Sequence, residues 1–178
     1  MKRLILFTII TLLINELMLF AQAGYPTPPP TDKMLFYLQR SHNKNTIIYD
    51  LNTYSDGKLN KDNPIKIYWL RYEEGGRLAD LSFIQKNAFG AKCTLSDKVK
   101  ESYTVRFNQF DKREIQLIKS ISGKYKAYMN INNDFAELSH VFIKSENNAL
   151  GMPIKVKYIE FHGVSAKSKK LVLEVMFL

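Results

Sequence analysis

The sequence predicts a mostly β domain: an antiparallel sandwich or closed barrel of about eight to nine strands with one short helix. Three observations support this fold class. Short runs rich in Ile, Val, Tyr and Phe recur along the chain, and turn residues separate them. Apolar and polar side chains alternate in the clearest run, KYKAYMNI, as they do in a half-buried strand. In one segment the apolar residues instead recur at helical spacing.

The strands are placed by these runs and by the turns between them. Asp56-Gly57 is typical of a turn, and Ser122-Gly123 lies between two apolar runs, where it predicts a tight hairpin. The expected strands are residues 34–40, 46–52, 64–72, 102–108, 114–121, 124–131, 138–144, 154–162 and 170–177.

The helix is expected over about residues 77–89, because apolar side chains recur there every three or four residues. Gly90 is predicted to end the helix in the left-handed conformation. The residues that form the apolar stripe are Leu78, Leu81, Ile84 and Ala88.

Residues 1–23 are predicted to be a signal peptide. The chain starts with the basic sequence MKR, continues with an apolar run, and reaches the small-x-small pattern AQA. A retained membrane anchor is the alternative. Asn15 and Glu16 argue against it, because a carboxylate facing lipid is costly. We therefore expect an exported protein, located in the periplasm or outside the cell.

The rest of the chain is predicted to be a Pro-rich linker, residues 24–33, followed by a single β-rich domain, residues 34–178. No later segment has the length of a transmembrane helix, so none is expected after signal cleavage. Cys93 is the only cysteine, which excludes an internal disulfide. It is expected to be a small buried side chain.

The net charge of +9 favours anionic partners such as phospholipid head groups, acidic glycans or an acidic protein. Peripheral contact with an anionic membrane surface is therefore expected. Nucleic acid is not, because the chain carries no recognition motif and is predicted to be exported. No metal or cofactor is expected, because the three histidines are scattered and no Gly-rich phosphate loop is present.

Two predicted strands end in charged residues, and these supply the candidate ligand-binding site. If Trp69 faces the core, Arg71 and Glu73 follow on the same face; in the late strand, Glu160 and His162 follow an apolar face in the same way. If the strand ends meet, these side chains line one polar pocket. The candidate site residues are Trp69, Arg71, Tyr72, Glu73, Glu160 and His162.

Three functions are consistent with this pattern. The leading one is a non-enzymatic module of the bacterial envelope that binds a small amphipathic or anionic ligand or another envelope component; Arg71 with aromatic neighbours suits carboxylate or phosphate recognition. The second is an envelope hydrolase with Glu73 and Glu160 as paired carboxylates. The third is a purely structural domain, in which Arg71 only pairs with Glu73 or Glu160.

Four blocks of the sequence stand out together: NTIIYDLN, PIKIYWLRYEEGG, LSFIQKNAFG and PIKVKYIEFHG. They resemble an uncharacterised bacterial family, a domain of unknown function found on exported proteins. The family pattern is a Tyr-Trp-x-Arg-Tyr strand, a carboxylate-Gly-Gly turn, a Leu-Ser-x-Ile-Gln helix and a late Tyr-Ile-Glu strand. The resemblance covers about Met34 to Glu174 and implies one compact exported domain with no known activity. Phe89 stands where the family commonly has Tyr.

Overall fold

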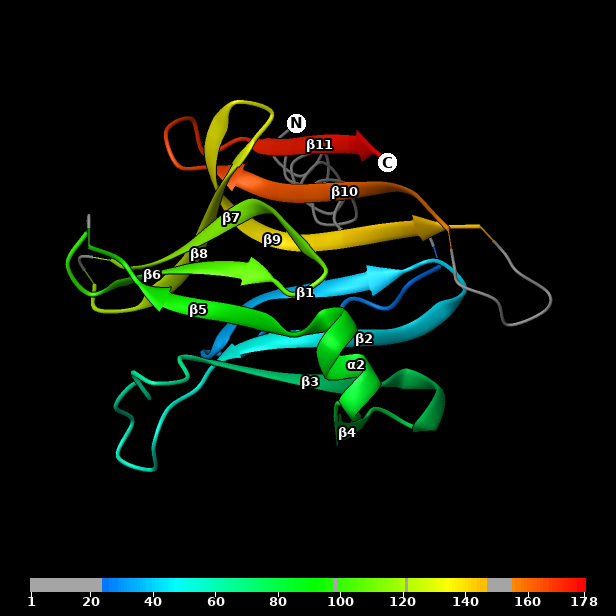
Figure 1. Cartoon of the computed structure of the whole chain (residues 1–178), viewed down its shortest axis with the longest axis horizontal. Coiled ribbons are helices and arrows are strands. Elements are labelled where there is room, and N and C mark those ends of the chain that lie inside the picture. The colour runs from blue at the N-terminus through cyan, green and yellow to red at the C-terminus, as the bar shows by residue number, and fades with distance from the viewer. Residues whose placement is uncertain (1–23, 98, 121, 147–154) are drawn as a thin grey trace, which may run out of the picture.

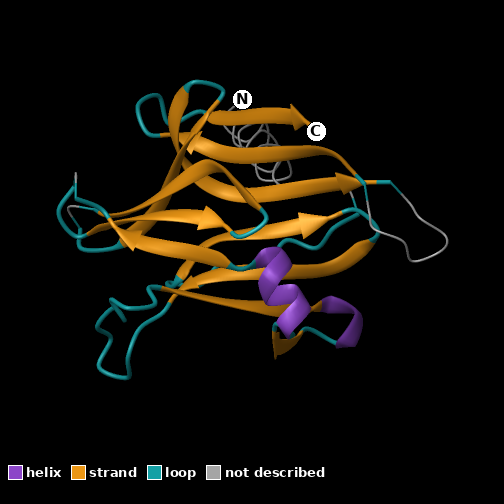
Figure 2. Ribbon diagram, in the orientation of Figure 1, coloured by secondary structure: helices purple, strands orange, loops and turns teal. Residues whose placement is uncertain are grey.

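The computed structural model describes residues 24–97, 99–120, 122–146 and 155–178, so the predicted signal peptide lies outside the described residues. Eleven strands form one sheet, accompanied by an α-helix and a short 3-10 turn (Figure 1 and Figure 2). This confirms the predicted mostly β fold with one short helix. The sheet curls into a half-barrel rather than forming two separate layers.

The sheet consists of two wings of four strands that extend from a long strand, β9. The strands run in the order β4-β3-β2-β1-β9-β8-β7-β6-β5, and β10 and β11 continue the sheet on the other edge of β9. The first wing comprises β1 (Met34–Arg40), β2 (Asn43–Leu51), β3 (Ile65–Arg71) and β4 (Arg77–Asp80). The second comprises β5 (Ala91–Leu95), β6 (Ser102–Phe107), β7 (Phe110–Lys119) and β8 (Tyr125–Ile131). The remaining strands are β9 (Asp134–Ser145), β10 (Val156–Ser165) and β11 (Leu171–Phe177).

Strand β9 joins both wings because three strands pair with it. One edge pairs with β10 over most of its length. On the other edge, the first half of β9 pairs with β8, and the second half pairs with β1 in parallel, from Tyr37 opposite His140 to Arg40 opposite Ile143. The wings therefore diverge from a common strand, and their inner faces turn toward each other (Figure 1).

One hydrophobic core fills the space between the wings. Phe36 stacks on Tyr49 within the first wing, with ring centroids 4.4 Å apart, and meets Phe107 of the second wing edge-on at 6.1 Å. Met129 and Leu138 are almost completely buried in the same cluster. Each such side chain contributes roughly 1.5–3 kcal/mol when it leaves water, so the core holds both wings together.

Helix α2 (Phe83–Phe89) occupies only the second part of the range predicted to be helical. Residues 77–80 form β4 instead, with Ala79 opposite Trp69 of β3. Of the predicted apolar stripe, only Leu81 is buried in the core, whereas Leu78 and Ile84 are 63% and 79% exposed. A short apolar run does not distinguish a strand from a helix by spacing alone. Ser82 caps the helix, accepting a hydrogen bond from the N–H of Gln85.

Gly90 follows the helix, but the prediction that it is left-handed was wrong: its φ is −66°. Glycine is required at this position because the neighbouring atoms leave no room for a side chain. A Cβ at this position would lie 2.2 Å from the backbone oxygen of Lys86 and 2.6 Å from Asn108. Helix α2 also contacts both wings, because Asn108 donates to the Lys86 carbonyl while the Phe89 ring meets Trp69 edge-on at 6.0 Å.

Nine of the eleven described strands lie near their predicted positions, and two strands, β4 and β5, were not predicted. Both additional strands are short and lie at the two ends of the main strand order, where few side chains are buried. Cys93 in β5 is half-buried and packs against the core. Burial raises the pKa of its thiol to about 11, which keeps it in the unreactive protonated form.

The predicted linker contacts the sheet on the face opposite the main core. The Gln39 side-chain amide donates to the carbonyl of Pro26 at 2.8 Å, and the Tyr25 ring meets Phe142 edge-on at 5.3 Å. Pro28 is buried. We call residues 24–30 the N-terminal strap. The strap packs against β1 and β9 instead of extending into solvent as a free spacer.

Candidate functional site

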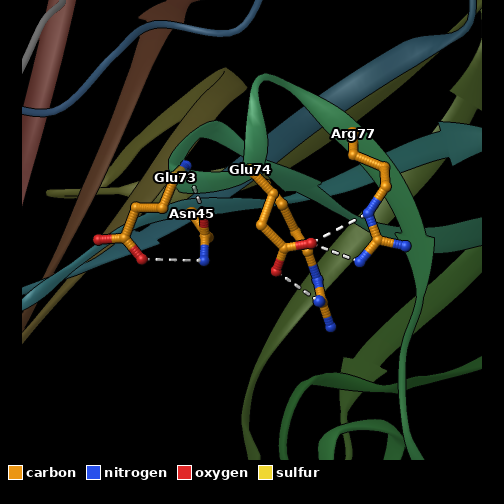
Figure 3. Close-up of polar contacts among 5 residues, drawn as sticks. Asn45, Glu73, Glu74 and Arg77 are labelled. Carbon is orange, nitrogen blue, oxygen red and sulfur yellow. Dashed lines mark hydrogen bonds and ion pairs between the residues drawn. The ribbon is translucent and has the colours of Figure 1, made fainter.

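The residues around Arg71 form a local polar cluster at the end of β3. Trp69 is buried in the core, as predicted, and Arg71 lies at the strand end, where it pairs with Glu74 at 2.7 Å. Glu74 also accepts a hydrogen bond from Arg77 (Figure 3). Hydrogen bonds from Arg77 and Arg71 lower the pKa of the Glu74 carboxyl.

Glu73 has a different partner. Its backbone N–H donates to the side chain of Asn45 at 3.2 Å, and its carboxylate accepts from the Asn45 amide at 3.4 Å (Figure 3). Glu73 and Glu74 belong to the 3-10 turn η1 (Tyr72–Glu74), and Gly75 and Gly76 follow with φ of 68° and 81°. The polar contacts therefore fix the turn that leads from β3 into β4.

Tyr72 lies on the opposite side of β3 from the core. It packs against a small second cluster made by Tyr37, Ile48 and Leu70. Its hydroxyl is buried without a hydrogen-bond partner in the described structure, and burial raises its pKa. Tyr72 therefore packs on the outer face of the first wing, the face turned away from the main core.

Glu160 and His162 lie on β10 and face away from the core, so the predicted orientation of this strand was wrong. Ile159 and Phe161, the residues on either side of Glu160, are buried in the core instead. The register with β9 shifts between Val156 and Tyr158, and such a bulge moves the following side chains to the other face.

His162 belongs to an aromatic stack on this outer face. Its ring lies 4.0 Å from the ring of His140, which in turn stacks on Tyr37 at 5.0 Å. The Nε2 atom of His162 is 2.9 Å from the Glu160 carboxylate. Desolvation of the buried ring, with the neighbouring His162, lowers the pKa of His140 to about 3.

The structure therefore does not bring the predicted pocket together. Arg71 and Glu73 lie at the end of β3, whereas Glu160 and His162 lie on β10, and strands β2, β1 and β9 separate them. Arg71 pairs with Glu74 and not with Glu73 or Glu160. Two separate polar clusters exist where one pocket was expected.

A different site lies between the wings. An apolar cavity of about 330 Å³ is lined by β1, β6, β7, β9 and β10, by helix α2 and by Leu178. Buried side chains such as Leu38, Val141 and Phe161 form its walls. Exposed residues, among them Ala88, Gln109 and Leu178, form its rim and connect it with solvent.

Arg40 is the one charged residue in the lining of the cavity as far as the structure describes the chain. Its guanidinium carbon lies 5.5 Å from the centre of the Trp69 ring and 5.4 Å from that of Phe89. Its Nε is buried without a partner, and its side chain has no hydrogen bond or ion pair within the described residues. Burial lowers the pKa of Arg40 from its ordinary value, although an arginine remains charged at neutral pH.

Sequence reasoning missed Arg40. The signal available was a cation at the end of the apolar strand MLFYLQR, directly before the polar residues Ser41 and His42. Arg71 ends its strand in the same way, so this pattern alone does not distinguish the two. The difference is that Arg71 has Glu74 three residues away, whereas Arg40 has no acidic residue nearby in sequence.

Within residues 24–97, 99–120, 122–146 and 155–178, no group of three or more His, Cys, Asp or Glu side chains could hold a metal ion. In the same part of the chain, no helix has the length and apolar character that a membrane crossing needs.

The fold and cavity define a curled β half-barrel with an apolar interior site. The family model "Domain of unknown function (DUF4833)" matches residues 36–175. The chain belongs to this family, which confirms the resemblance to a domain of unknown function. Comparisons with curated proteins and with solved structures give no match.

Proposed function

We propose that this protein is an exported, non-enzymatic binding module of the bacterial envelope, which holds an apolar or amphipathic small molecule between the wings of its half-barrel. The observation that supports this proposal is the apolar cavity. Binding sites for small molecules are mostly apolar, with a few placed polar groups and volumes of roughly 300–1,000 Å³. The cavity has this composition and about 330 Å³.

The signal-like sequence of residues 1–23 supports export, and the net charge of +9 supports peripheral contact with an anionic membrane surface. Such contact would bring the protein to a source of amphipathic molecules. The hydrolase alternative has no comparable support. Paired carboxylates must flank one bond, whereas Glu73 follows the end of β3 and Glu160 lies on β10, and three strands separate β3 from β10.

The first test is binding of the neutral fluorescent probe N-phenyl-1-naphthylamine, whose emission rises in apolar surroundings. We expect the emission to rise with wild-type protein. Ala88→Trp should weaken binding by about tenfold or more, because the indole would fill the rim of the cavity.

Ile84→Trp is the matched control. Ile84 is on the same helix and 79% exposed, and it does not line the cavity. It should bind the probe like wild type. Absence of binding to wild type, or equal weakening by both substitutions, would contradict the proposal.

A further inference from the structure

We infer that the cavity selects single-chain anionic amphiphiles, with Arg40 binding the carboxylate or phosphate head group and the apolar walls holding the chain. This inference rests on the proposed function and names the class of ligand. It assigns the recognition role to Arg40, in place of the Arg71 expected from sequence.

The hydrogen-bonding state of the polar lining supports this assignment. Of the described residues that line the cavity, three are polar: Arg40, Gln109 and Ser145. Ser145 exchanges hydrogen bonds with Ser41, with the two hydroxyl oxygens 2.9 Å apart, and Gln109 donates to Asn87 at 3.3 Å. Arg40 alone is left without a partner, so it is the group with donors to offer a ligand.

The charge of the cavity supports the same conclusion. Among the described residues that line it there is no aspartate or glutamate, so within this part of the chain a bound head group would meet one guanidinium and no carboxylate. An unpaired charge removed from water is costly, and an anion would remove that cost. A guanidinium binds carboxylate or phosphate through two parallel hydrogen bonds.

The aromatic neighbours orient the guanidinium. Trp69 and Phe89 both lie within cation–π distance of it. Neither ring supplies a negative charge, so the contacts restrain Arg40 without neutralising it. The donors remain available for an anion while the side chain is positioned in advance, which lowers the entropy lost on binding.

The size of the cavity limits the apolar part of the ligand. A volume of about 330 Å³ is at the lower end of the range for small-molecule sites. One aliphatic chain fits this limit better than the two chains of a membrane phospholipid. Leu38, Val141 and Phe161 supply the surface against which the chain would pack.

The experiment measures displacement of N-phenyl-1-naphthylamine by ligands that share one chain: decanoate, decyl phosphate and 1-decanol. Wild type should bind at least one of the two anions about tenfold to a hundredfold more tightly than the alcohol, as expected for charge-assisted hydrogen bonds. The decanoate and decyl phosphate measurements separate a carboxylate ligand from a phosphate ligand.

Arg40→Met should lose this preference and still bind 1-decanol, which also shows that the variant is folded. Arg40→Gln is the second variant if the methionine disturbs packing. Arg106→Met is the matched control, because it removes the same charge from an exposed side chain that pairs with Glu114 outside the cavity. It should keep the preference.

The outcomes separate this inference from the proposed function. Equal affinity of wild type for the alcohol and the anions overturns this inference and leaves the cavity as a site for neutral ligands. A preference for the anions that survives in both Arg40 variants overturns the role of Arg40. If wild type binds neither the probe nor any decyl compound, the proposed function and this inference both fail.

Discussion

Arg40 and His140 are both basic side chains largely removed from water, and they respond to burial differently. Arginine keeps its charge, so Arg40 needs an anion or an aromatic surface beside it, and the described residues provide only the aromatic surface. Histidine can lose its proton. His140 is 1% exposed, is stacked between Tyr37 and His162, and is neutral at pH 7.

The lowered pKa of His140 predicts a loss of stability in weak acid. Its pKa is about 3 when folded and about 6.5 in the unfolded chain, so the unfolded state binds the proton first as the pH falls. The contribution is complete above pH 6.5 and is lost progressively from there toward pH 3. At pH 5 the loss of stability relative to neutral pH amounts to about 2 kcal/mol.

Urea unfolding at pH 7.5 and pH 5 checks this prediction. His140→Phe, which keeps an aromatic ring in the stack, should reduce the difference in unfolding free energy between the two pH values. His42→Asn serves as the control, because His42 is exposed with a φ of 64°, which asparagine tolerates. If His140→Phe shows the same pH dependence as wild type, another group is responsible.

At the scale of secondary structure, the sequence predicted the strands well and the site poorly. Nine strands could be located because each is a run of β-branched and aromatic residues between turns. Strand β4 could not, because RLAD has no alternation and its pairing with β3 depends on the two glycines before it.

The prediction of the candidate site failed because β10 contains a β-bulge. Regular alternation predicts that Glu160 follows Val156 and Tyr158 on the inner face, but the register shift after Val156 reverses this, and Ile159 faces inward. A single bulge changes every later side chain of the strand, and no residue type in KVKYIE signals it. The cavity could not be predicted from the sequence either, because its lining depends on how helix α2 and five strands are placed relative to one another.

The N-terminal strap gives a prediction at this scale. Tyr25 packs on Phe142, and its hydroxyl accepts a hydrogen bond from the N–H of His42 at 3.1 Å. Tyr25→Ala should therefore lower the free energy of unfolding by about 1–2 kcal/mol, from a lost aromatic pair and a lost hydrogen bond.

Pro29→Ala is the matched control, because Pro29 belongs to the same segment and is exposed. It should unfold at nearly the same urea concentration as wild type. A Tyr25→Ala variant as stable as wild type would mean that the strap contributes nothing to the folded domain.

For the whole molecule, the shared core predicts a single cooperative unfolding transition. Buried residues of both wings and of β9 belong to one cluster, and β9 pairs with both wings. The wings should therefore unfold together. Fluorescence of Trp69, the only tryptophan, reports on the first wing, whereas far-UV circular dichroism reports on all the strands.

The two signals should give coincident urea transitions. Val105→Ala in the second wing and Ile47→Ala in the first should each shift both signals by the same amount, because both side chains are fully buried in the common core. A Trp69 transition that moves only with Ile47→Ala would show that the wings unfold separately.

The parallel pairing of β1 with β9 has a consequence for how the chain acquires its fold. Strand β1 ends at Arg40, but the partner for its open edge starts at Asp134, after the second wing has been synthesised. Contacts so distant in sequence form slowly, because a long loop must close before they contribute. A growing chain therefore carries the apolar inner face of the first wing without the strand that joins it to the second wing until β9 arrives. We expect this interval to be when the protein is most prone to aggregate and most dependent on a holding chaperone.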